Sequence, residues 1–224
     1  MVSNLSNYDT LIISDTHFDS VFDIKRARYL KSLTSGFKTI IINGDLYEGY
    51  KVSGKSFIKT WGDFFTRISK DKEIIYLIGN HDSKALLQKD ITKVFKTIDK
   101  KYTLYLPNSK IKITHRESKN ISIDIKYGIQ KFPIYLSRIL LSINRYEHKQ
   151  IQLATKRLNE IKYVKNETVF NIKDIKCIYS HSHKPKVNIS KKTVNTGFIN
   201  YGFSSYVAID SLNGTAKLVK EPYL

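Results

Sequence analysis

The sequence has no long apolar run, only one cysteine and few acidic residues for its length. No apolar stretch approaches the roughly 18–20 residues that cross a bilayer as a helix. The N-terminal segment MVSNLSNYDT lacks the basic and apolar regions of a secretion signal. Cys177 has no second cysteine to pair with, and its apolar neighbours in IKCIY favour a buried side chain over a nucleophile. These absences argue against a helical membrane protein and a disulfide-stapled domain, and they favour a soluble protein of a reducing cytoplasm.

Basic residues outnumber acidic ones by 38 to 20, which gives a formal net charge of +18. A lysine-rich composition bias is the simplest explanation, but such a bias would raise glutamate as well. A positive field attracts nucleic acid, an anionic membrane surface or phosphorylated small molecules, and the charge alone does not choose among them. The segment YLSRILLSINRYEHKQ is a further reason to consider peripheral membrane contact. The sequence does not fix an oligomeric state.

The hydrophobic pattern predicts a single α/β domain over residues 1–224. In the first half, apolar strands alternate with amphipathic helices, so a layered core is expected. We expect strands at 9–14, at 37–44 and within 72–82, and helices at 21–34, 55–69 and 83–98. Later segments alternate apolar and polar residues and predict a second sheet: YTLYL, SKIKITH, ISIDIKYG, IKCIYSH, KVNIS, TVNTG, YVAID and AKLVK. The basic, helical pattern of residues 132–165 predicts an insertion into this domain.

One arrangement recurs along the chain: an apolar strand runs into a short turn of metal-ligand residue types. It occurs as LIISDTH, IIINGDLYE, IIYLIGNHD, IKITHRE and CIYSHSHKP. Five of the six histidines lie in these turns, and only His148 lies elsewhere. Ligands gather beyond the carboxyl ends of strands in α/β sheets, so these turns are expected to converge. The candidate site residues are Asp15, His17, Asp45, Asn80, His81, Asp82, His115, His181 and His183.

Each turn taken alone has an ordinary structural explanation. Asp and Asn cap helices and close turns, Gly44 supplies positive φ, and an isolated histidine is more often a surface residue. Five such coincidences in one chain favour a shared site instead. Carboxylate, imidazole and amide oxygen together suit divalent ions such as Mn²⁺, Fe²⁺ or Zn²⁺. There are ligands for two ions if one carboxylate bridges, and such a pair clamps a phosphoryl group and deprotonates a water for attack.

The ordered motifs DTH, GDLYE, GNHD, THRE and SHSHKP resemble those of the calcineurin-like metallophosphoesterase family. The resemblance spans residues 15–183 and implies a four-layer αββα sandwich of two mixed sheets flanked by helices. It implies one ion held by Asp15, His17, Asp45 and His183, and a second held by Asp45, Asn80, His115 and His181. It further implies that His81 binds phosphate or protonates the leaving oxygen, and that Asp82 orients the His81 ring.

The chain departs from the family pattern at two positions. Ser180 stands where glycine usually precedes the His-x-His pair, which requires a negative φ there. His115 lacks the usual preceding glycine. The segment 132–165 resembles the cap-like insertion of UDP-diacylglucosamine pyrophosphatase-like members. Those enzymes typically carry arginine in place of His81, so the resemblance implies the cap and not the lipid substrate.

The expected function is therefore metal-dependent hydrolysis of a phosphoester or pyrophosphate by a water or hydroxide held between two ions. Mn²⁺ is the expected metal, with Fe²⁺, Zn²⁺ and Ni²⁺ as alternatives. The expected substrate is a phosphorylated small molecule or nucleotide. Two alternatives stay open: a nuclease or phosphodiesterase acting on nucleic acid, which the charge favours, and a non-catalytic scaffold of the same fold.

Overall fold

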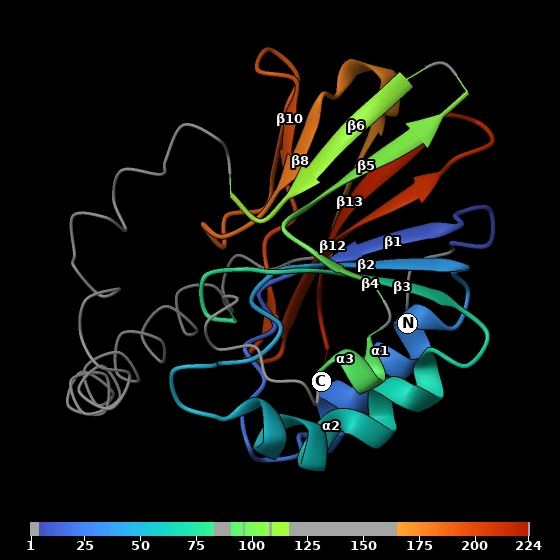
Figure 1. Cartoon of the computed structure of the whole chain (residues 1–224). Coiled ribbons are helices and arrows are strands. Elements are labelled where there is room, and N and C mark those ends of the chain that lie inside the picture. The colour runs from blue at the N-terminus through green and yellow to red at the C-terminus, as the bar shows by residue number, and fades with distance from the viewer. Residues whose placement is uncertain (1–4, 83–90, 96, 108, 117–164, 224) are drawn as a thin grey trace, which may run out of the picture.

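The computed structural model describes residues 5–82, 91–95, 97–107, 109–116 and 165–223. Two mixed β-sheets pack face to face, and helices cover the outer face of the larger sheet (Figure 1). The predicted α/β fold with two mixed sheets is confirmed. In the described part of the chain the helices lie on one side only, so the fourth layer is not seen there. The predicted insertion at 132–165 lies, except for its last residue, outside the described residues.

The larger sheet has eight strands, and the sequence order alternates strand and helix at its start as predicted. Along its main path the order is β4-β3-β2-β1-β12-β13-β7, with β11 pairing to β12. Its strands are β1 (Thr10–Ile13), β2 (Thr39–Asn43), β3 (Glu73–Leu77), β4 (Thr97–Asp99), β7 (Asn166–Asn171), β11 (Ile199–Asn200), β12 (Phe203–Asp210) and β13 (Thr215–Pro222). The first four pair in parallel, so their carboxyl ends lie along one edge.

The smaller sheet has five strands in the order β5-β6-β8-β10-β9. These are β5 (Lys101–Leu106), β6 (Ser109–Thr114), β8 (Cys177–Tyr179), β9 (Lys186–Asn188) and β10 (Thr193–Asn195). Strands β6, β8 and β10 run parallel, so their ends also meet on one side. A short 3-10 turn, η2 (Ile172–Asp174), connects β7 to β8.

Three helices cover the larger sheet: α1 (Ile24–Thr34), α2 (Gly54–Ile68) and α3 (Ile91–Val94). Asp23 caps α1 by accepting the Arg26 amide, and Ser53 caps α2 by accepting the Ser56 amide, which satisfies otherwise orphan donors. The helix predicted at 83–98 extends too far. Its last residues belong to β4, where backbone pairing with β3 outweighs helical periodicity.

Alternating side chains of the central strands divide the interior into two cores. Leu11, Ile40 and Ile42 face the helices, while Ile12 and Ile41 face the smaller sheet. This period of two explains why the strands read as continuous apolar runs, because both of their faces are buried. The sandwich therefore leaves the strand ends, and the polar turns that follow them, as the place for a site.

Candidate metal centre

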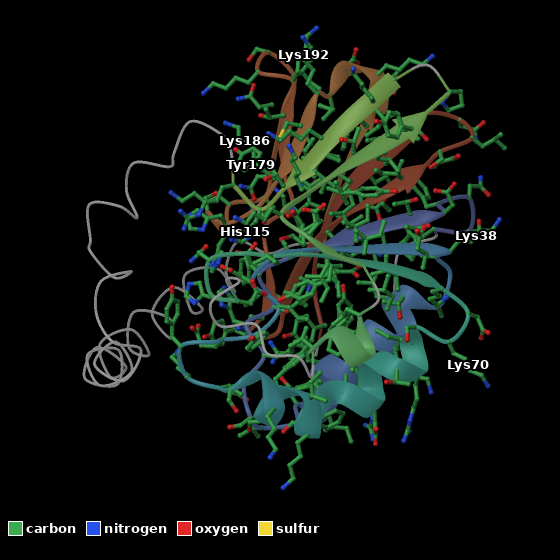
Figure 2. All side chains as sticks on the ribbon, viewed as in Figure 1. Lys38, Lys70, His115, Tyr179, Lys186 and Lys192 are labelled. Carbon is green, nitrogen blue, oxygen red and sulfur yellow. The ribbon has the colours of Figure 1, made fainter. Side chains whose placement is uncertain are left out.

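The predicted turns converge at the carboxyl ends of both sheets. The larger sheet contributes Asp15 and His17 after β1, Asp45 after β2, and Asn80 to Asp82 after β3. The smaller sheet contributes His115 after β6, and His181 and His183 after β8. Figure 2 labels His115 at this junction of the two sheets. The site thus combines residues from five turns that lie up to 168 positions apart (183 − 15) in the sequence.

Several of these residues adopt left-handed backbone conformations. Positive φ is uncommon outside glycine and costs of order 1–3 kcal/mol where it is strained. Such strain persists only where surrounding contacts hold it, and it marks functional turns. The residues concerned are Asp15 (φ 50°), His17 (44°), Asp45 (51°), His181 (73°) and His183 (53°). Every one of the five is a predicted metal ligand, so the strain coincides with the candidate centre.

One group of ligand atoms gathers around Asp15. His183 Nε2 lies 3.1 Å from Asp15 Oδ1 and 3.3 Å from His17 Nε2. Asp15 Oδ1 is buried and accepts no hydrogen bond from the described residues. A carboxylate oxygen and two imidazole nitrogens that face one another in this way provide lone pairs for a cation. The donor set around Asp15 therefore fits a divalent metal ion.

A second group gathers around His115. Its Nε2 lies 3.2 Å from Asp45 Oδ2 and 3.0 Å from Asn80 Oδ1. The ring of His181 is 5.3 Å from that of His115, centroid to centroid. Asp45 Oδ2 also lies 3.9 Å from His17 Nε2, so one carboxylate reaches both groups. This geometry fits a second cation that shares Asp45 with the first.

Burial and charge set the protonation of these groups. Burial alone would raise the pKa of Asp45, but the imidazoles of His115, His81 and His17 lower it strongly. Burial would lower the pKa of His115, but Asp45 outweighs it and raises that pKa to about 9. Burial and the nearby charge of Arg116 lower the pKa of His181 to about 4. Without metal, a proton on His115 thus balances the Asp45 carboxylate.

Two glycines allow the ligands to approach closely. Gly44 has a φ of +82°, and a Cβ there would overlap the ring of His115. At Gly79 a Cβ would overlap the carboxylate of Asp45. These positions explain the G of GDLYE and of GNHD, because any larger residue would displace a candidate ligand.

His81 lies beside the two groups and is held by Glu48. Its Nδ1 is 2.7 Å from Glu48 Oε1, and its Nε2 is 4.0 Å from Asp45 Oδ2. The other Glu48 oxygen lies 3.5 Å from His17 Nδ1. Burial would lower the pKa of His81, but the hydrogen bond to Glu48 and the charge of Asp45 raise it. A protonated imidazole next to the centre can donate a proton.

The orienting role predicted for Asp82 is wrong in this geometry. Its carboxylate accepts the amide N–H groups of Leu46 and Gly79, each at 2.6 Å, and the hydroxyl of Tyr76 at 2.5 Å. Adjacent residues of an extended turn project to different sides, so Asp82 turns into the core while His81 turns to the site. Asp82 holds the turns together, and Glu48 orients the ring.

A model of the calcineurin-like phosphoesterase family matches residues 8–195. This match covers every predicted ligand. The chain belongs to the calcineurin-like phosphoesterase family. It is accordingly a hydrolase that acts on phosphoester bonds, in a family that depends on dinuclear metal centres. Family membership favours the enzyme over the scaffold alternative. Among curated proteins, none matches the sequence.

Three solved structures illustrate how distant similar phosphoesterases are. An archaeal phosphodiesterase is 16% identical with a TM-score of 0.47, over 94% of this chain and 98% of its own. YfcE, a phosphoesterase from E. coli, is 16% identical with a TM-score of 0.47, over 89% and 86%. A metallophosphoesterase from Sphaerobacter thermophilus is 11% identical with a TM-score of 0.47, over 96% and 88%.

Two calcineurin-like phosphoesterase features bear on the sequence predictions. Ser180 does not have positive φ, as its place before His181 requires. Glu48 was given no role from the sequence, although it closes GDLYE three residues after Asp45. Its acidic type within a metal-ligand turn was the available signal. In the described residues, no helix is long and apolar enough to cross a membrane.

Proposed function

We propose that this calcineurin-like phosphoesterase binds two divalent cations that share Asp45. One ion would be held by Asp15, His17, Asp45 and His183, and the other by Asp45, Asn80, His115 and His181. The observation that carries the proposal is the approach of Asp45 Oδ2 to His115 Nε2 at 3.2 Å and to His17 Nε2 at 3.9 Å. One carboxylate oxygen between two imidazoles from opposite groups is the arrangement that a bridging ligand needs.

The chemistry of the donors favours Mn²⁺, with Fe²⁺, Zn²⁺ and Ni²⁺ as alternatives. The set combines carboxylate, imidazole and amide oxygen and contains no thiolate, which suits ions of borderline hardness. When bound, the ions supply Lewis-acid activation of water and neutralise the charge of the phosphoryl group.

We propose that His81 is the general acid. The substrate P–O bond to the leaving group breaks as the oxygen of a water forms the new P–O bond. His81, held at Nδ1 by Glu48, gives its Nε2 proton to the leaving oxygen. The attacking water loses its proton to solvent. A hydrogen-bonded carboxylate keeps the imidazole charged, and a positioned acid of this kind contributes roughly 10²- to 10⁴-fold.

Direct assay of hydrolysis tests this function. Purified protein with Mn²⁺ should cleave nitrophenyl phosphate esters, and Asp45→Ala and Asn80→Ala should each abolish turnover. Asp63→Ala, which removes an exposed carboxylate of α2, is the matched control and should retain full activity. An active Asp45→Ala protein would refute the assignment.

The substrate class requires a separate panel. Monoesters, diesters, pyrophosphates, nucleotides, UDP-sugars and short DNA should be compared under one Mn²⁺ concentration. We favour a phosphorylated small molecule or nucleotide as substrate. The lysines labelled in Figure 2 lie on different sides of the molecule rather than along one groove, which gives the nuclease alternative no specific support.

A further inference from the structure

The hydroxyl of Ser180 contacts His115 on the side away from the proposed cations. Ser180 Oγ lies 2.9 Å from His115 Nδ1 and 2.8 Å from the carbonyl oxygen of Asn43. The same Nδ1 lies 2.9 Å from that carbonyl. Ser180, His115 and Asn43 are 1%, 3% and 0% exposed, so water does not compete for these contacts. The three groups form a closed triangle of hydrogen bonds.

The donors of this triangle can be assigned from its chemistry. A carbonyl oxygen only accepts, so the hydrogen must sit on Nδ1 of His115, shared between Asn43 O and Ser180 Oγ. The Ser180 hydroxyl in turn donates to Asn43 O. Nε2 of the neutral ring is then left with its lone pair, facing Asp45 Oδ2 and Asn80 Oδ1. The triangle therefore selects the tautomer and ring orientation that a metal ligand requires.

The same contacts join the two sheets at the site. Asn43 ends β2 of the larger sheet, whereas His115 and Ser180 follow β6 and β8 of the smaller sheet. Asn43 Nδ2 donates to the carbonyl of Thr114 at 3.1 Å, and the Ser180 amide donates to the carbonyl of His115 at 3.1 Å. The imidazole is consequently fixed from both sides of the sandwich, and the Ser180 hydroxyl is the side-chain group that completes this fixation.

We infer that Ser180 is a positioning residue for the second cation, acting through His115 and not by contact with metal or substrate. The inference rests on the proposed dinuclear site. Loss of a hydrogen-bond partner behind a metal-bound imidazole typically weakens metal affinity by roughly 10- to 100-fold. We expect a loss of that size at the second position and none at the first.

The test separates the two positions and measures binding of Mn²⁺ by calorimetry, without any assay of turnover. His183→Ala removes a ligand of the first ion and should leave one site, built on His115. Asn80→Ala removes a ligand of the second ion and should leave the other. Adding Ser180→Ala to the His183→Ala protein should raise the Kd for Mn²⁺ roughly 10- to 100-fold. Adding it to the Asn80→Ala protein should change Kd less than about threefold.

Ser204→Ala is the matched control. Ser204 is as buried as Ser180, at 1% exposure, but its hydroxyl accepts the Tyr29 hydroxyl and contacts no proposed ligand. It should leave the Kd unchanged in both backgrounds. An equal change of Kd in the two backgrounds, or no change in the His183→Ala protein, would overturn the positioning role.

Failure of the underlying metal site would look different. If His183→Ala and Asn80→Ala each still bound two ions, the proposed dinuclear site itself would be wrong, and this inference with it. Should Ser180→Ala not fold, Ser180→Gly also lacks the hydroxyl and serves in its place. If neither variant folded, the hydroxyl would act on the fold as a whole, and the positioning role would be overturned.

Discussion

At the scale of single residues, ligand types were readable from the sequence, but the partners of each side chain were not. Aspartate and histidine at strand ends announce a metal centre because few other functions require them together there. Which acid faces His81 depends on side-chain directions in a folded turn. Asp82 is adjacent in sequence yet turns to the core, while Glu48 arrives from another strand end and contacts the ring.

Replacement of Glu48 by glutamine tests its role in proton donation. Glu48→Gln keeps the shape of the side chain but removes the charge that holds a proton on His81. We expect kcat to fall about 10- to 100-fold for an alkyl phosphate and much less for a nitrophenyl ester, because a good leaving group needs little protonation. Steady-state kinetics on both substrates measure the ratio. Equal losses on both would contradict a role in general acid catalysis.

The raised pKa of His115 predicts that metal uptake releases a proton. In the metal-free protein His115 is protonated below about pH 9, whereas a bound cation requires its neutral form. Apparent affinity should therefore rise with pH, by up to about tenfold per unit between pH 7 and 9, and level off above. Calorimetry in buffers of different ionisation enthalpy counts the protons released. A pH-independent affinity across this range would contradict the predicted charge state.

At the scale of secondary-structure elements, strands were predicted best where both faces are buried. Runs such as those of β1, β2 and β3 leave no other use for so many adjacent apolar residues. Short or half-exposed strands escaped prediction. β4 has three residues and β7 is exposed along most of its length, so neither carries a clear hydrophobic period. Their pairing depends on neighbours distant in the sequence.

The turn between β2 and the GDLYE motif gives a prediction at this scale. Gly44→Ala places a methyl group where the His115 ring lies and requires positive φ of an alanine. We expect loss of metal binding at the second position and destabilisation by more than about 1 kcal/mol. Gly36→Ala is the control, because a Cβ there meets nothing within 4 Å. Urea unfolding and Mn²⁺ titration measure both effects; a fully metal-binding Gly44→Ala protein would show that the turn can relax.

At the scale of the whole molecule, the site draws on both sheets and is possible only after they have packed. Pairs such as Asp15 with His183 or Asp45 with His115 cross from one sheet to the other. No local pattern encodes these distances. The sequence supported them only through the joint occurrence of five turns, and the sandwich supplies the geometry.

Metal binding should therefore stabilise the entire sandwich. Each ion that binds only the folded state adds about 2.7 kcal/mol at a free concentration 100 times its Kd. We expect Mn²⁺ to raise Tm and a chelator to reverse the increase. Differential scanning calorimetry measures the shift, and Asp45→Asn should lose most of it while keeping the Tm of the metal-free protein. A shift of the same size in that variant would place the stabilising ions elsewhere.

The surroundings of Trp61 provide a natural optical probe of the centre. Trp61 is the sole tryptophan of the chain and is fully buried. Its ring lies 4.1 Å from that of Phe18, which directly follows His17, and its indole N–H donates to Asp19 O at 3.0 Å. Any shift of the DTH turn must disturb the environment of the indole. Intrinsic fluorescence can thus follow occupancy of the first ion in real time, with no dye, label or added reporter.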